Sequence, residues 1–136
     1  MKMREIMRLV EGRSIEIDWV PPRRGPGYAV VWVDVKKIDA SWSRDYVYVG
    51  PGGEGGTGRR YAGFGKWLET RDVPVEMSEL GIGGHGWIVF TNGRHRFSWM
   101  RDHGVRALPV LVPEDEVEAI SQQFGTSERR SVIHAD

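Results

Sequence analysis

The sequence has 136 residues, a length that suits one compact domain with its own hydrophobic core and predicts no second domain. Forty per cent hydrophobic residues and six tryptophans argue against a disordered chain, and 18 glycines predict several constrained loops. Lys plus Arg and Asp plus Glu both number 19, so no overall charge draws the protein to nucleic acid or to a membrane surface.

Two further features bear on the compartment. The chain has no cysteine, which excludes disulfide bonds and fits a reducing cytoplasm. Charged residues interrupt residues 1–20 repeatedly, so this segment predicts neither a signal peptide nor a membrane span. We therefore expect a cytoplasmic protein with no membrane insertion.

Strand signals dominate the first third of the chain. β-Branched and aromatic residues predict strands over residues 14–19, 28–35 and 46–49. The first two are separated by the Pro- and Gly-rich turn at residues 21–27. This alternation of strands and turns predicts a sheet early in the chain.

A glycine-rich loop follows at residues 50–58. Gly53, Gly55 and Gly58 fit the dinucleotide pattern G-x-G-x-x-G, but a Rossmann unit needs a longer βαβ segment around it. A P-loop is excluded as well, because Arg59 and Arg60 stand where Lys and Ser/Thr are required. Two interpretations stay open: a flexible connection, or a lid that brings both arginines over a bound anion.

The next segment predicts a helix and then a strand. Residues 61–70 place Phe64, Trp67 and Leu68 on one helical face. In the strand predicted over residues 73–77, alternation separates Glu76 from its apolar neighbours. If that polar face lines a cleft, Glu76 could bind Mg²⁺ or orient a water molecule; otherwise it is a solvated residue on an edge strand.

The strongest functional signal is the segment from residue 87 to residue 113. It predicts a buried strand at 87–90, a turn at 91–93, a helix that ends near Gly104, and a strand at 108–112. Arg94, His95 and Arg96 fall in the first helical turn, where cations are unfavourable unless an anion neutralises them. Phosphate bound by residues 92–96 is one explanation; arginines that simply extend into solvent are the other.

The chain closes with a helix and a tail. Pro113, the acidic residues 114–116 and an apolar stripe predict a helix over residues 113–124, ended by Gly125. Residues 126–136 are polar, and we expect a loose tail after a single domain formed by residues 1–125.

These motifs together resemble a known family. The arginines at 59–60, the helix that follows, the Pro-containing strand and the loop at residues 93–96 resemble the ParB/sulfiredoxin superfamily over residues 33–113. Within it, the segments 48–53, 58–61, 64–68 and 91–97 are similar to plasmid fertility inhibition factors. The resemblance implies an α+β fold, with a single compact ParB/sulfiredoxin-like domain in which helices pack on a small mixed sheet.

The chain also departs from the superfamily. Sulfiredoxins carry a catalytic cysteine where Arg94 stands, so thiol-dependent repair is excluded. ParB clamps carry a helical DNA-binding domain after the nucleotide domain, whereas only 23 residues follow Pro113. A partitioning clamp is therefore not expected.

For function, the resemblance implies inhibition of conjugative or type IV secretion DNA transfer, with a coupling protein of that apparatus as partner and ATPase or DNase activity. An enzyme of this kind would be a metal-dependent phosphohydrolase using ATP or another nucleotide, Mg²⁺ and DNA as a substrate. The alternative is a non-enzymatic inhibitor or adaptor with a vestigial nucleotide site. We predict phosphate or nucleotide binding by Asn92, Gly93, Arg94, His95, Arg96, Arg59 and Arg60, catalysis by Glu76 and His95, and metal binding by Glu76.

Overall fold

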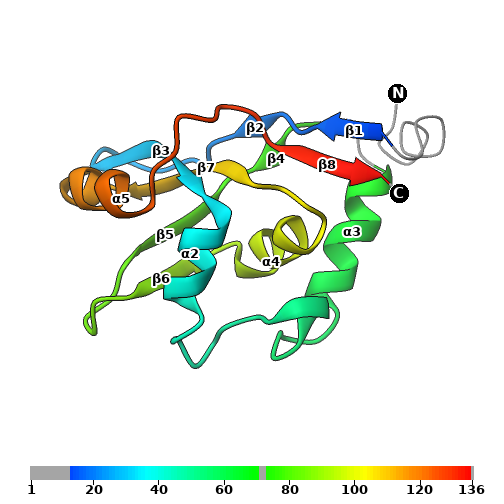
Figure 1. The fold of residues 1–136 in the computed structure, drawn as a ribbon, viewed down its shortest axis with the longest axis horizontal. Coiled ribbons are helices and arrows are strands. Elements are labelled where there is room, and N and C mark those ends of the chain that lie inside the picture. Colours follow the sequence, from blue (N-terminus) through cyan, green and yellow to red (C-terminus); the bar gives the residue numbers. More distant parts are fainter. Residues whose placement is uncertain (1–12, 71–72, 136) are drawn as a thin grey trace.

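The computed structural model describes residues 13–70 and 73–135 of the chain (Figure 1). Strands and helices alternate along it, with two short 3-10 helices labelled η. The elements are β1 (Arg13–Glu16), β2 (Trp19–Val20), β3 (Tyr28–Asp34), α2 (Val35–Trp42), η1 (Pro51–Gly53), α3 (Arg60–Thr70), β4 (Val75–Glu76), β5 (Ser78–Ile82), β6 (Ile88–Asn92), α4 (Arg94–Asp102), β7 (Ala107–Pro113), η2 (Glu114–Glu116), α5 (Val117–Phe124) and β8 (Val132–Ala135).

The main sheet has four strands in the order β3-β7-β5-β6. It is mixed, because β7 pairs antiparallel with β3 and parallel with β5, and β5 pairs antiparallel with β6. A parallel pair of β2 and β4 and an antiparallel pair of β1 and β8 form two smaller sheets. The α+β fold with a small mixed sheet, predicted from the sequence, is therefore confirmed.

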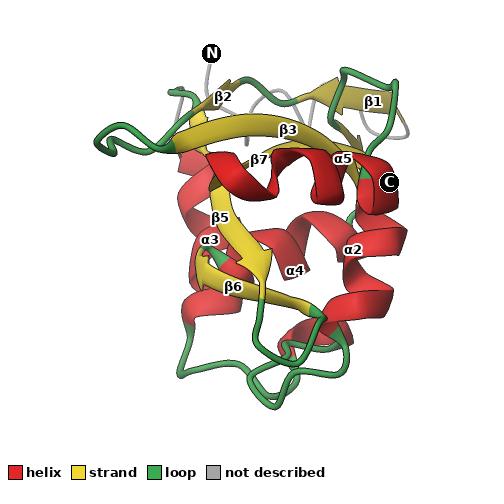
Figure 2. Cartoon of the chain, turned by 90° about the vertical axis from the view of Figure 1, so that its left-hand side faces the viewer, coloured by secondary structure: helices red, strands yellow, loops and turns green. Residues whose placement is uncertain are grey.

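Helix α4 lies at the centre of the molecule. It carries five buried residues in nine positions, and it lies between α2 and α3 in Figure 1. Figure 2 shows the sheet bending around these helices, with β3 and β7 above and β6 below. A helix buried on most sides must satisfy its polar side chains within the protein, which decides what the residues of α4 can do.

The strand predicted at residues 46–49 is wrong, and helix α2 was not foreseen. Val35 was expected to extend β3, but the side chain of Asp34 accepts the backbone N–H of Lys37 at 3.0 Å and caps a new helix. Its buried residues Val35, Ile38 and Trp42 follow helical spacing. Tyr46 lies in the loop after α2 and is 97% exposed, so its strand propensity is not used.

The loose tail predicted at residues 126–136 also differs from the structure, in which Val132–Ala135 pair with β1. Ser131 and Ile133 are both fully buried. The Ser131 hydroxyl donates to the Ala107 carbonyl at 2.6 Å and accepts the Trp19 indole N–H at 2.8 Å. The partner strand lies more than a hundred residues away in sequence, so local composition could not reveal the pairing.

Two predicted elements also have different bounds in the structure. The strand predicted at 73–77 is reduced to Val75–Glu76, and β5 follows it as a separate strand that was not predicted. The last predicted helix is divided into η2 and α5, with Gly125 at its end as expected. Within the described part of the chain, no helix has the length and apolar character that crossing a membrane requires.

Candidate functional site: a cleft at the start of helix α4

A cleft of about 770 Å³ opens where α3, β4 and the turn between β6 and α4 meet. The sequence analysis had assigned residues of three separate segments to one site. The cleft brings these segments together. Arg59 is the predicted site residue that does not line it. The lining residues are Val20, Val47, Arg60, Gly63, Phe64, Trp67, Pro74, Glu76, Phe90, Thr91, Asn92, Gly93, Arg94, His95 and Arg96.

Gly93 sets the sharp turn from β6 into α4. Its φ angle is +81°, in the left-handed region that favours glycine. A Cβ atom here would lie 2.5 Å from the Ser78 hydroxyl and 2.6 Å from the Arg96 guanidinium. The Ser78 hydroxyl in turn donates to the Gly93 carbonyl at 2.8 Å. The predicted helix start at Arg94 is thus confirmed, and its geometry requires glycine.

Arg94 points from this turn toward the loop that precedes α3. Its guanidinium donates to the Val47 carbonyl at 2.6 Å and to the Thr57 hydroxyl at 2.7 Å. The cation predicted to hold phosphate therefore joins two ends of one loop in the structure.

His95 is bonded to the same loop and is 8% exposed. Its Nε2 atom accepts the backbone N–H of Thr57 at 2.9 Å, so this nitrogen carries no proton. Burial, with the positive charges of Arg94 and Arg60, lowers the pKa of His95 below its ordinary value. A neutral ring that already accepts a hydrogen bond at Nε2 is a poor candidate for a general acid at that atom.

Arg96 and Glu76 face each other on the other side of the cleft. The Arg96 guanidinium donates to the carbonyls of Glu76 at 3.1 Å and Met77 at 3.3 Å, which ties α4 to the region of β4. It lies 4.0 Å from the Glu76 carboxylate. As the alternation of the strand predicts, Val75 and Met77 are buried while Glu76 is exposed and lines the cleft.

The cleft also has an aromatic wall. Phe64 and Trp67 of α3 stack with their ring centroids 5.8 Å apart at an interplanar angle of 23°. Phe90 of β6 contributes a third ring, packed against Phe97 at 5.0 Å. The cleft therefore combines an apolar surface with Arg60, Arg94 and Arg96, a combination that suits a ligand with an aromatic or apolar group and an anionic group.

A second set of contacts, at the far end of α4, was not foreseen. The Asp102 carboxylate accepts the Gly52 backbone N–H at 2.9 Å, the Tyr61 hydroxyl at 2.7 Å and the Arg101 guanidinium at 2.9 Å. These bonds hold the pKa of Asp102 below its ordinary value despite burial, whereas burial and Asp102 raise the pKa of Tyr61 to about 12.

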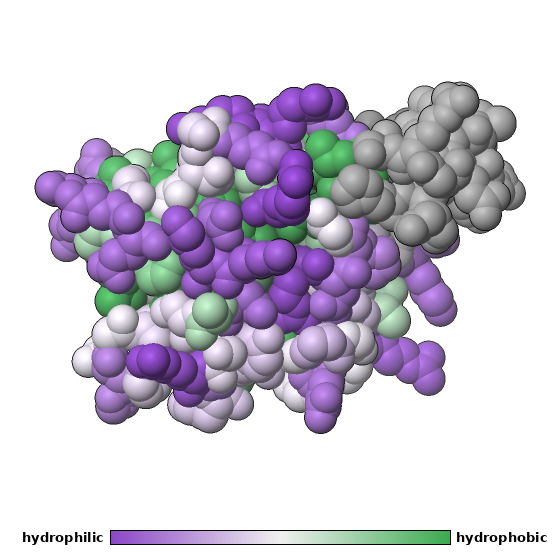
Figure 3. All heavy atoms as spheres, in the orientation of Figure 1, coloured by the Kyte–Doolittle hydropathy of each residue, from purple (hydrophilic) through white to green (hydrophobic). Residues whose placement is uncertain are grey.

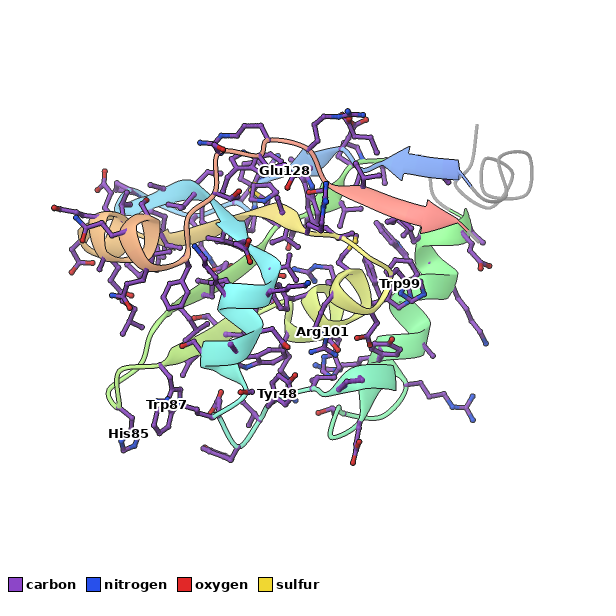
Figure 4. All side chains as sticks on the ribbon, in the orientation of Figure 1. Tyr48, His85, Trp87, Trp99, Arg101 and Glu128 are labelled. Atoms are coloured by element: carbon purple, nitrogen blue, oxygen red, sulfur yellow. The ribbon has the colours of Figure 1, made fainter. Side chains whose placement is uncertain are left out.

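Arg101 completes this far-end network. Its guanidinium donates to the Asp39 carboxylate at 2.9 Å and the Val49 carbonyl at 2.8 Å, and it lies 5.6 Å from the ring centroid of Tyr48. Figure 4 shows Arg101 and Tyr48 together between α2 and α4. The spacing of these residues in sequence gives no sign of the network, because they come from α2, from the segment that follows it and from α4.

A protein-held metal site is not supported within the described ranges. Residues 13–70 and 73–135 contain no group of three or more His, Asp or Glu side chains that could hold an ion. Glu76 is the one carboxylate among the lining residues of the cleft. Mg²⁺ at this place would need most of its ligands from a bound phosphate and water.

A model of the plasmid fertility inhibition factor family matches residues 66–125. The matched segment runs from within α3 through the turn at Gly93 to the end of α5. Over this segment the chain is similar to plasmid fertility inhibition factors. The resemblance predicted from the sequence is confirmed for that part of the chain.

The fold is also similar to a solved fertility inhibition factor. The crystal structure of the oncogenic suppression activity protein, a plasmid fertility inhibition factor solved as a gold(I) cyanide derivative, aligns with a TM-score of 0.58 and 19% sequence identity. The alignment covers 83% of this chain and 63% of that one. No curated protein matches the sequence. The wider resemblance to the ParB/sulfiredoxin superfamily is compatible with the fold and stays a prediction.

Proposed function

We propose that this protein inhibits conjugative or type IV secretion DNA transfer in the cytoplasm of a donor cell, and that its cleft binds a nucleotide. The similarity of residues 66–125 to that family supports the first part. The observation that carries the second part is the cleft itself, which gathers three arginines and the Gly93 turn beside an aromatic wall. A nucleotide offers both a planar base and anionic phosphate.

A mating assay tests the biological part of the proposal. Expression of the protein in a donor should reduce transfer of a co-resident conjugative plasmid without slowing growth. Unchanged transfer across several plasmid types, with the protein well expressed, would overturn it. A pull-down from such donors should recover a coupling or secretion ATPase, and its persistence after nuclease treatment would distinguish a protein partner from bridging DNA.

Calorimetry with ATP tests the ligand. Arg60→Ala should weaken binding because it removes an exposed cation that lines the cleft, by about 1.5–3 kcal/mol if one charge-assisted hydrogen bond is lost. Arg59→Ala is the matched control, since Arg59 neighbours Arg60 but does not line the cleft. Equal loss of affinity in both variants would contradict binding at this place.

Glu76 supports a second candidate, a metal-dependent ATPase or DNase. Its exposed carboxylate lines the cleft and could contribute a ligand to Mg²⁺ carried by bound phosphate. Cleavage of ATP or DNA should then require a divalent metal and should fall strongly in Glu76→Ala. Nucleotide binding with no cleavage under any metal would reject the enzyme and leave a binding protein.

An inhibitor without catalysis would act by docking on its target. Tyr46 is the most exposed of the large hydrophobic residues described, at 97%, and tyrosine is common among residues that dominate interface energies. The face in Figure 3 is largely hydrophilic. Tyr46→Ala should weaken inhibition of transfer if docking uses this loop, and leave ATP affinity unchanged.

A further inference from the structure

The segment between α2 and α3 contains the glycine-rich loop at residues 50–58 and runs beneath α4 in Figure 1. Both ends of α4 hold it. At the start of the helix, Arg94 and His95 bond to Thr57; at its end, Asp102 accepts the N–H of Gly52. The loop is therefore held at both ends, in contrast to the flexible connection that was one of the two interpretations of its composition.

Tight packing accompanies these bonds. A Cβ atom at Gly56 would lie 3.1 Å from the His95 ring, and one at Gly53 would lie 2.6 Å from the ring of Tyr61. Gly53 also has a φ angle of +88°. Gly53 and Gly56 thus let the backbone approach α3 and α4 closely.

One carbonyl and one hydroxyl of the segment before α3 accept hydrogen bonds from the Arg94 guanidinium and hold its side chain toward the loop. Val47 and Thr57 are ten residues apart, and one guanidinium joins them at 2.6 and 2.7 Å. Val47 itself lines the cleft. These contacts therefore fix the position of one residue that lines the cleft.

Arg60 also lines the cleft, but it differs from Arg94 in exposure and in its contacts. It is exposed, and among the described residues no hydrogen bond or ion pair engages its guanidinium. It can reach an anion without giving up an existing contact, whereas Arg94 would have to release the loop.

Resting on the proposed nucleotide site, we infer that Arg94 and His95 are positioning residues that clamp the glycine-rich loop and shape the cleft, and that Arg60 is the arginine that contacts the ligand's phosphate. This assignment divides the residues that the sequence had grouped into a single phosphate site. It predicts that loop order and ligand affinity respond differently to different arginines.

Hydrogen exchange of residues 50–58 in the ligand-free protein tests the clamp. Thr57→Val removes the hydroxyl that Arg94 contacts but leaves every cation in place, and Arg94→Lys keeps the charge but not the paired geometry. Both variants should speed exchange of the loop by about three- to tenfold, the effect of one lost hydrogen bond. Arg60→Ala should leave exchange unchanged, and so should the control Arg59→Ala.

Calorimetry with ATP supplies the second readout. Arg60→Ala should lower affinity about tenfold or more, and Thr57→Val should lower it less, through the altered position of Val47. Two results together would overturn the positioning role: Thr57→Val binds ATP at least as tightly as wild type, and Arg94→Lys leaves the hydrogen exchange of the loop unchanged. Failure of wild type to bind ATP would reject the nucleotide proposal and the role of Arg60, while loop exchange would still decide the clamp.

Discussion

The phenol of Tyr61 donates a hydrogen bond to Oδ2 of Asp102 at 2.7 Å, and the backbone N–H of Gly52 reaches the same oxygen at 2.9 Å. One carboxylate oxygen thus joins the first turn of α3, the last residue of α4 and the glycine-rich loop. Residues of both α3 and α4 line the cleft, so this bond joins two of the elements that form it.

Tyr61→Phe removes this bond and should lower the free energy of unfolding by about 1 kcal/mol, because a partly exposed hydrogen bond to a carboxylate contributes modestly. Urea denaturation measures the change. Tyr46→Phe is the control, since Tyr46 is 97% exposed and should show no effect. Equal stability of the Tyr61 variant and wild type would mean that water replaces the phenol at no cost.

Gly93→Ala should destabilise the protein by at least about 2 kcal/mol, because a side chain is disfavoured at positive φ and must also displace packed atoms. The added Cβ would lie 2.5 Å from the Ser78 hydroxyl. Gly84→Ala is a matched control, since a Cβ there meets no atom within 4 Å. Thermal melting of both variants should separate them clearly, and similar melting temperatures would contradict the described turn.

Trp42 is fully buried, packs against Tyr48, Phe90 and Phe97, and its indole N–H lacks a hydrogen-bond partner among the described residues. Trp42→Ala should cost about 3–5 kcal/mol of unfolding free energy through lost contacts and a cavity. Trp42→Phe should cost much less, because it removes the unsatisfied donor together with part of the volume. Denaturant titration of the two variants measures both changes in unfolding free energy. A larger loss of unfolding free energy in Trp42→Phe than in Trp42→Ala would contradict the prediction.

Acidification should loosen the glycine-rich loop through His95. The pKa of His95 is lowered in the folded protein by burial and by Arg94 and Arg60, so the folded state favours the neutral ring. The stabilisation is present above the ordinary pKa of about 6.5 and is lost as the pH falls through the lower folded value. Below that value the protonated Nε2 can no longer accept the N–H of Thr57.

Hydrogen exchange of Thr57, corrected for the intrinsic pH dependence, should therefore accelerate as pH falls below about 6.5. His95→Phe removes the acceptor and the titration together, so its corrected exchange should be fast and independent of pH in this range. A loop whose corrected protection in wild type does not change with pH would show that this hydrogen bond is not what holds it.

Local patterns determined several parts of this protein. A turn that ends in Gly93, with Gly104 as the later helix end, located α4 and its start at Arg94. Alternation around Glu76 indicated which side chain would be exposed there. These signals are reliable because they depend on the period of one element and on residues adjacent in sequence.

Tertiary structure decided what those residues contact. The chemistry of Arg94 and His95 is equally suited to phosphate and to a loop carbonyl or N–H, and only folding brings Val47 and Thr57 into reach. The same holds for β8, which lies in a segment whose overall composition predicts a tail, whereas in the structure β1 pairs with it from the other end of the chain. The spacing of apolar residues and the residue propensities specify individual helices and strands. The packing of those helices and strands decides which groups distant in sequence form hydrogen bonds.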